Sequence, residues 1–227
     1  MKEIVESWLP IERDWFLAMN KVQTDFLDNM FWVITEEIVW IILLIVVAAL
    51  FFYKRPWKEG ALMLVFLVFA VFLFDQFSSS IFKPYFERLR PTHHPDFKDI
   101  VLTVKGYRSK GFSFVSGHAT NSFGTALFLS LYYAKRWIVF PIYTWAILFS
   151  YSRIYMGLHF ITDIVGGMVV GSIIALVTYM LFNILRKKTL KVHSKPLFTA
   201  EQSRTAGVII TLYLIAVIIL SPFLSTI

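Results

Sequence analysis

The sequence predicts an all-α, polytopic membrane protein with six transmembrane helices and an N-terminal interfacial amphipathic helix. Of its 227 residues, 57% are hydrophobic and 18% are aromatic. The mean hydropathy is +0.66. Several apolar stretches approach the roughly 20 residues that a helix needs to cross a bilayer. A soluble domain of this length needs more polar surface than this composition supplies.

The charge pattern also favours a membrane protein. The net charge is +7, but the lysines and arginines lie in the connections between apolar stretches rather than on one face of a soluble fold. We therefore expect membrane lipids as partners and no nucleic acid. The absence of cysteine excludes disulfides and thiolate metal sites, and it leaves the redox compartment and the oligomeric state undetermined.

The first 28 residues are predicted to form the interfacial helix. Glu3, Glu6 and Glu12 stand where a signal peptide would carry basic residues, so no cleaved signal is expected. Apolar residues recur at helical spacing, which is typical of a helix lying on a membrane surface with a packing role. They are Ile4, Trp8, Ile11, Trp15, Met19 and Val22.

Residues 29–227 are predicted to form one six-span domain. Asp75 interrupts the second span, where we expect it to support a neighbouring group by ion pairing or hydrogen bonding. The polar connections include a candidate active-site loop, 83–111, and a basic loop, 186–206. The expected spans are 29–53, 61–82, 112–133, 137–155, 159–185 and 207–224.

Six spans place the N-terminus, the loop 83–111 and the turn after Arg153 on one side of the membrane. Cations divide evenly between the two sides, but the short loops of the other side are almost free of acids. The positive-inside rule therefore favours loop 186–206 as cytoplasmic. The polar loop would then face the extracytoplasmic side, most simply of a bacterial inner membrane.

The first polar cluster on that side is Lys83-Pro-Tyr-Phe-Glu-Arg-Leu-Arg90-Pro. If this segment is helical, a spacing of seven places Lys83 and Arg90 on one face. Two fixed cations suit a phosphate, with arginine as a bidentate donor and lysine as a point charge. The alternative is an ordinary basic patch beside the membrane.

The second cluster is Ser116-Gly117-His118, immediately before an apolar run. Ser116 can cap a helix, and Gly117 allows the backbone to approach a ligand closely. Free N–H groups at a helix N-terminus bind anions, and His118 would stand beside that anion as a proton donor. A capped helix with an incidental histidine is the alternative.

The third cluster runs from Arg153 to Asp163 and holds a cation, an imidazole and a carboxylate between two apolar runs. If a helix begins near residue 159, His159 and Asp163 lie one turn apart. Asp163 can then accept a hydrogen bond from one ring nitrogen, which leaves the lone pair of the other ring nitrogen available. A histidine merely satisfied by its helix neighbour is the alternative.

Together, Lys-x6-Arg-Pro, Ser-Gly-His and Ser-Arg-x5-His-x3-Asp, in this order, resemble the type 2 phosphatidic acid phosphatase (PAP2) family of membrane lipid phosphatases. The resemblance covers about residues 20–186. The family usually has proline where this chain has Val115, a change that removes no functional group.

The resemblance implies roles for these residues in a metal-independent phosphatase without cofactors. His159 would be the nucleophile that forms a phosphohistidine, oriented by Asp163, and His118 the acid and base. The phosphate oxygens would be bound by Lys83, Arg90, Arg153, Ser116 and Gly117. No metal is expected, and His93, His94 and Asp96 are interpreted as lid residues of the 92–112 loop.

The expected substrate is a lipid carrying a terminal phosphate. An isoprenyl diphosphate carrier, phosphatidylglycerophosphate or phosphatidate is the first hypothesis, and a lipid A phosphate is the second. A rival of another class is a non-catalytic binder or transporter of lipid phosphates. Such a protein would need the cations but neither the two histidines nor Asp163.

Overall fold

The computed structural model describes residues 1–191 and 198–225, apart from the side chain of Glu37. All regular structure in these ranges is helical, which confirms the predicted all-α class. The elements are α1 (Lys2–Glu6), α2 (Leu9–Asn20), α3 (Asp25–Thr35), α4 (Glu37–Leu50), α5 (Trp57–Asp75), the π-helix η1 (Gln76–Phe82), α6 (Lys83–Phe86), α7 (Gly117–Tyr133), α8 (Arg136–Tyr155), α9 (Ile161–Leu190) and α10 (Ala200–Leu224).

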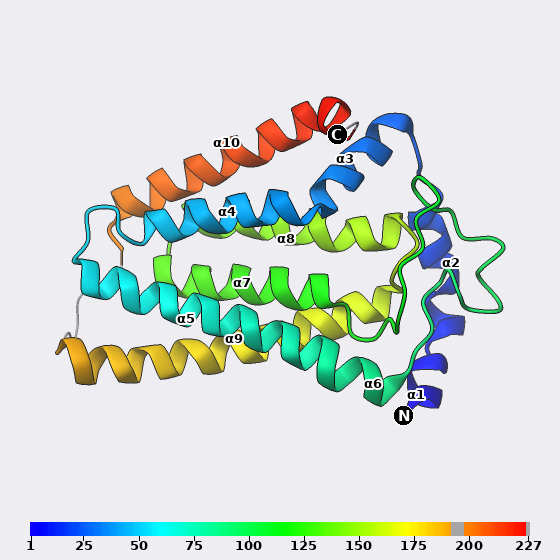
Figure 1. Ribbon diagram of the computed structural model, residues 1–227, viewed down its shortest axis with the longest axis horizontal. Coiled ribbons are helices and arrows are strands. Elements are labelled where there is room, and N and C mark those ends of the chain that lie inside the picture. Colours follow the sequence, from blue (N-terminus) through cyan, green and yellow to red (C-terminus); the bar gives the residue numbers. More distant parts are fainter. Residues whose placement is uncertain (192–197, 226–227) are drawn as a thin grey trace.

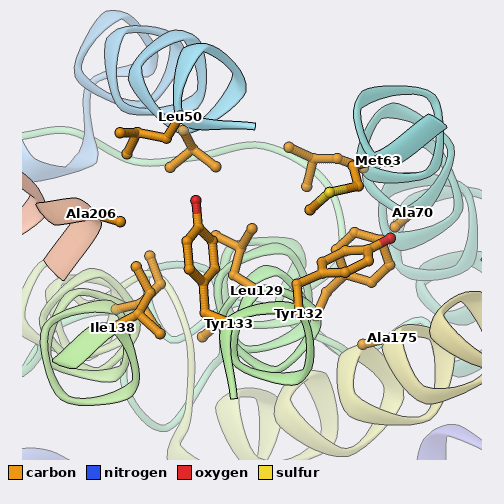
Figure 2. Close-up of a cluster of buried hydrophobic side chains, with 14 of the residues drawn as sticks. Leu50, Met63, Ala70, Leu129, Tyr132, Tyr133, Ile138, Ala175 and Ala206 are labelled. Carbon is orange, nitrogen blue, oxygen red and sulfur yellow. The ribbon is translucent and has the colours of Figure 1, made fainter. Parts of the chain in front are cut away.

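The long helices form a bundle around α7, which packs on α5, α8 and α9 (Figure 1). Tyr132 and Tyr133 of α7 are 1% and 2% exposed and lie at the centre of the main hydrophobic core. Side chains from the other helices surround them and complete this core. Figure 2 shows Leu50 of α4, Met63 and Ala70 of α5, Ile138 of α8, Ala175 of α9 and Ala206 of α10 around them.

Three helical segments are long and apolar enough to cross a membrane: 57–86, 161–190 and 200–224. Their outer faces are apolar; on α5, Val65, Val68 and Phe72 are 62%, 61% and 57% exposed. Exposed apolar residues on this scale fit a helix that faces lipid rather than water. A fourth span results if α3 and α4 are counted together, and the six-span layout stays a prediction.

The expected continuous span over 29–53 is wrong in one respect, because it is broken between α3 and α4. The two helices meet at an angle of 55°. Glu36 between them has an extended backbone, with ψ at 134°. Two consecutive glutamates, Glu36 and Glu37, stand at this break, where the chain leaves the helical conformation.

A π-helix joins α5 to α6 and leads directly to Lys83. Ser78 within it is fully buried, and its hydroxyl donates to the Asp75 carbonyl at 3.2 Å. The wider π turns change which residues face the bundle, and such segments are frequent at functional sites. The helix then ends at Phe86, where Glu87 adopts a left-handed conformation with φ at 50°.

The predicted N-terminal helix is two helices, α1 and α2, lying across one end of the bundle (Figure 1). The chain breaks at Ser7 and Trp8, and Pro10 stands in the first turn of α2, where a missing N–H is tolerated. Leu9 and Phe16 are buried, whereas Ile11 and Trp15 are 77% and 72% exposed. Apolar side chains therefore lie on both the buried and the exposed face, and the amphipathic, interfacial character of this segment stays a prediction.

The opposite end of the bundle holds a buried ion cluster. Glu59 pairs with Arg186 at 2.6 Å and also with Arg55. In the predicted basic loop 186–206, α9 continues to Leu190 and α10 begins at Ala200. Residues 192–197 of that loop lie outside the described ranges.

Glycine allows α7 and α9 to approach to backbone contact. A Cβ at Gly167 would lie 2.6 Å from the Ser116 carbonyl oxygen, and one at Gly171 would lie 2.3 Å from that of Thr120. The same approach lets the Ser116 N–H donate to the Asp163 carbonyl at 3.0 Å. The start of α7 is thereby fixed against the start of α9.

We expect Gly171→Ala to destabilise the protein by about 1–3 kcal/mol, because the added methyl group meets backbone that cannot rotate away. Thermal unfolding in detergent measures the effect. Val177→Ala, at a 51% exposed position of the same helix, is the control and should change stability little. Equal midpoints for the two variants would contradict the close contact between α7 and α9.

Candidate active site

The structure brings the three clusters to one end of the bundle, where α6 and α8 end and α7 and α9 begin (Figure 1). Lys83 opens α6, Arg153 lies in the last turn of α8, and Asp163 lies in the first turn of α9. Segments separated by up to 80 positions of sequence therefore face one small volume.

His159 and Asp163 pair as expected, although the helix begins at Ile161 rather than near residue 159. The helix begins there because Asp163 Oδ2 accepts the Phe160 N–H at 2.9 Å and caps the first turn. The same oxygen lies 3.3 Å from His159 Nδ1. If Nδ1 carries the proton, as the carboxylate favours, Nε2 presents the lone pair.

Arg90 lies directly at this lone pair, with Nη1 3.1 Å from His159 Nε2. It also donates to the Leu158 carbonyl at 3.0 Å and, through Nε, to the Lys110 carbonyl at 3.1 Å. Burial lowers the pKa of Arg90 despite the opposing charge of Asp163. The chain is not helical at Arg90, so the expectation that Lys83 and Arg90 share a helix face is wrong; a left-handed turn at Glu87 brings Arg90 back instead.

Lys83 and Arg153 complete a group of three cations. Lys83 Nζ lies 3.8 Å from the point where a Cβ of Gly117 would be. Arg153 is 6% exposed, and its Nη1 donates to the Thr35 hydroxyl. Its Nε is buried and has no hydrogen-bond partner in the part of the chain that the structure describes. All three cations lie close enough to His159 and His118 to act on them electrostatically.

In the described ranges, none of Lys83, Arg90 and Arg153 lies within ion-pairing distance of a carboxylate. Removing cations from water without a counter-ion is costly. An entering anion would relieve this cost and satisfy the free Arg153 Nε. The three cations therefore form a site suited to a phosphate group.

The N-terminus of α7 adds backbone donors to these cations. Ser116 caps the helix by accepting the Ala119 N–H at 3.5 Å, which confirms the predicted cap. Gly117 follows it, next to Lys83 Nζ and to the buried hydroxyl of Ser78. Free N–H groups and the helix dipole at this point favour an anion.

His118 stands between the cations and an open cavity. The cavity has a volume of about 410 Å³ and is lined by Lys83, Gly117 and His118 at one end and by Trp40, Trp145 and Phe149 along one wall. The imidazole of His118 packs against Phe149, with ring centroids 4.8 Å apart. His118 can therefore exchange a proton with a group that occupies the cavity.

Arg88 and Glu12 also belong to this site, although the sequence alone did not indicate them. Arg88 is completely buried; it donates to Asp163 Oδ1 at 2.7 Å and to Glu12 Oε1 at 2.6 Å. Glu12 also accepts the backbone N–H of Thr162 at 2.8 Å. Arg88 thus ties α2 to the carboxylate that orients His159.

The carboxylates next to Arg88 explain why its guanidinium stays charged although it is buried. Burial alone lowers the pKa of the guanidinium, but the charges of Asp163 and Glu12 outweigh it and raise the pKa. The one sequence signal was Glu12 itself, which stands on the helix face of Leu9 and Phe16 that the structure buries. A carboxylate on a buried face needs a partner.

The predicted lid residues of the 92–112 loop lie outside this group. His94 Nε2 pairs with Glu6 of α1 at 3.0 Å, and its ring packs against Phe97 and Phe160. The pair joins the loop to the N-terminal helices. Among the described residues, no cluster of three histidines or carboxylates has an arrangement suited to a metal ion.

Comparison with known proteins establishes the class. Residues 59–187 match the PAP2 superfamily. The chain belongs to this superfamily, as its three motifs indicated, and is an integral membrane phosphatase.

Its relatives include two enzymes named lipid A 4′-phosphatase. The chain is 42% identical to that of Porphyromonas gingivalis, over 82% of this chain and 79% of the relative. It is 32% identical to that of Bacteroides thetaiotaomicron, over 74% and 75% of the two chains. The crystal structure of LpxE from Aquifex aeolicus superimposes with a TM-score of 0.61 at 26% identity, over 75% of this chain and 95% of that one.

We expect Arg88 to act as a positioning residue, through Asp163 and His159. Arg88→Gln leaves two buried carboxylates without a counter-ion, so we expect a loss of about 3–5 kcal/mol in stability. In the folded fraction, kcat should fall about 10²-fold with little change in KM, because His159 loses its fixed orientation.

Arg88→Lys retains the charge and should recover part of kcat. Lys98→Gln, at an exposed position of the loop, is the control. If Arg88→Gln and the parent protein had the same turnover per folded molecule, Arg88 would be purely structural.

Proposed function

We propose that this protein removes a phosphate group from lipid A or a closely related saccharide lipid, through a phosphohistidine formed on His159. The observation that carries the proposal is the group of three cations, Lys83 and the buried Arg90 and Arg153, which have no carboxylate partner among the described residues. They lie beside a histidine whose Nδ1 faces a carboxylate. The two lipid A 4′-phosphatases among the relatives support this substrate over the carrier lipids and phospholipids of the first hypothesis.

In the first step, His159 Nε2 attacks phosphorus while the bond to the leaving oxygen breaks. Arg90, now 3.1 Å from Nε2, would shift its hydrogen bond to a phosphate oxygen. Lys83 and Arg153 neutralise the charge that develops on the other oxygens. Asp163 holds the ring and stabilises its positive charge, and His118 protonates the departing alcohol.

In the second step, His118 removes a proton from water, which attacks the phosphohistidine. The P–N bond breaks, His159 returns to its neutral form and inorganic phosphate leaves. The same two histidines therefore serve both steps, with His118 alternating between acid and base.

We place this site on the extracytoplasmic side of a bacterial inner membrane. The support is that the short loops on the opposite side of the predicted topology carry cations and almost no acidic residues. The lipid tails would remain in the bilayer while the phosphate reaches the end of the bundle.

The mechanism is tested with purified protein and radiolabelled lipid A. His159→Ala should abolish phosphate release and leave no label on the protein. His118→Ala should slow release about 10²–10⁴-fold. With p-nitrophenyl phosphate, whose leaving group needs no proton, His118→Ala should accumulate an acid-labile phosphoprotein.

His93→Ala, which changes an exposed histidine of the loop, is the matched control and should behave as the parent. If His159→Ala and His118→Ala both kept full turnover while Arg153→Ala lost lipid binding, the non-catalytic binder would be the better interpretation.

Metal independence gives a separate test. The cations already supply the positive charge that a metal would provide, so excess chelator should leave kcat unchanged. Phosphate release before and after dialysis against EDTA measures this. Loss of activity that a divalent ion restores would contradict the proposed mechanism.

A further inference from the structure

The cavity next to His118 extends away from the phosphate site and has polar groups along one wall. It runs between α4, α5, α7 and α8, and its lining includes His118 but not His159. Its remaining walls are largely apolar, from Ile41, Leu44 and Val71. A volume of about 410 Å³ lies in the range of small-molecule sites.

The chemistry of the proposed function assigns an occupant to this space. In an in-line displacement, the attacking nitrogen and the leaving oxygen lie on opposite sides of phosphorus. His159 is on one side, and His118, which must reach the leaving oxygen, is on the other. The leaving alcohol therefore lies on the side of His118, where the cavity is.

Four polar side chains face this alcohol from two helical segments. Asp75 and Ser79 lead to Lys83 at intervals of four residues along α5 and η1, and the Ser79 hydroxyl donates to Asp75 Oδ1 at 3.2 Å. On α7, Asn121 and Thr125 continue the face of His118. We call Asp75, Ser79, Asn121 and Thr125 the polar strip.

Asn121 gives the strip its clearest indication of a ligand. Its Oδ1 is buried and has no hydrogen-bond partner within residues 1–191 and 198–225, although the side chain lines an open cavity. An unsatisfied buried amide oxygen costs about 1–3 kcal/mol. A rotation of the Asn121 amide toward the cavity would let a hydroxyl or amide N–H of a bound molecule satisfy it.

We infer that the polar strip is a subsite for the leaving alcohol and selects lipids whose head group carries hydroxyl or amide donors next to the phosphate ester. The inference rests on the proposed function and adds to it the residues that recognise the alcohol. Asp75 and the Asn121 oxygen accept hydrogen bonds from these donors, and Ser79 and Thr125 can accept or donate.

The strip also disfavours one class of competitor. An isoprenyl diphosphate releases an isoprenyl monophosphate, which carries negative charge and no neighbouring hydroxyl. Its charge would face the Asp75 carboxylate across the cavity, and the acceptors of the strip would remain unpaired. Specificity would thus come from repulsion as well as attraction.

The experiment compares the purified full-length protein with Asn121→Leu and Asp75→Asn variants in detergent. We expect kcat/KM for lipid A to fall about tenfold in each variant, since each removes one hydrogen bond to the alcohol. For farnesyl diphosphate, Asp75→Asn should raise kcat/KM, and Asn121→Leu should leave it unchanged. The inhibition constant of inorganic phosphate, which has no leaving alcohol, should stay within twofold in both.

Asn183→Leu on α9, whose amide donates to the Tyr179 carbonyl at 3.1 Å, is the matched control and should leave all three measurements unchanged. Asp75 also acts electrostatically on Lys83. If that were its whole role, lipid A turnover and phosphate inhibition would weaken together, and the subsite would be rejected. Unchanged lipid A turnover in both variants would reject it as well.

Failure of the underlying function gives a different result. A parent protein that releases no phosphate from lipid A, or a His159→Ala variant that still does, would refute the proposed function itself. A parent that is active on lipid A, with variants that lose activity on both lipids equally, would refute only the subsite.

Discussion

The structure depends on one constraint: three cations lie together at the end of an apolar bundle, and no carboxylate among the described residues pairs with them. Lys83 lies in α6, Arg90 in the loop directly after it and Arg153 in α8, and mutual repulsion would separate them if the surrounding fold did not hold them. Arg90 is held by two carbonyl oxygens and Arg153 by Thr35 at the bend between α3 and α4. Packing and these hydrogen bonds offset the repulsion between the cations. A bound anion relieves this repulsion, so the same arrangement favours anion binding.

The buried carboxylate beside His159 has another role. Asp163 could neutralise these cations, but its two oxygens are already engaged by Arg88, by the Phe160 N–H and by His159. Arg88 is in turn held by Glu12. The histidine is thus oriented by one network of charges, and the phosphate site by another. This separation leaves the cations unpaired and the imidazole aligned in the same small volume.

The sequence was sufficient for the residues whose positions follow from topology. The ends of successive spans alternate between the membrane faces, so Lys83, His118 and His159 had to share one end, and the structure places them there. Ser116 was recognisable as a cap because capping depends on residues close in sequence. The order of the motifs likewise pointed to the superfamily that the comparison established.

Contacts that depend on tertiary docking could not be predicted in this way. Arg88 and Glu12 are 76 positions apart, and no periodicity connects a surface helix to a loop. The bend at Glu36 and the start of α9 at Ile161 were missed because an apolar pattern does not show where backbone N–H groups find other acceptors. The three motifs did not choose between the substrate hypotheses, because they describe the phosphate and not the alcohol attached to it.

The glycine contact between α7 and α9 has a consequence for how such a protein can diversify. With Gly167 and Gly171 against the α7 backbone, the helix starts that carry His118 and Asp163 are locked in a fixed register. The distances required for chemistry cannot adapt to each new lipid. Substitutions can instead accumulate in α4 and α5, which line the cavity beside His118, because side chains there can change without disturbing that register. A single catalytic frame can in this way serve many head groups over evolutionary time.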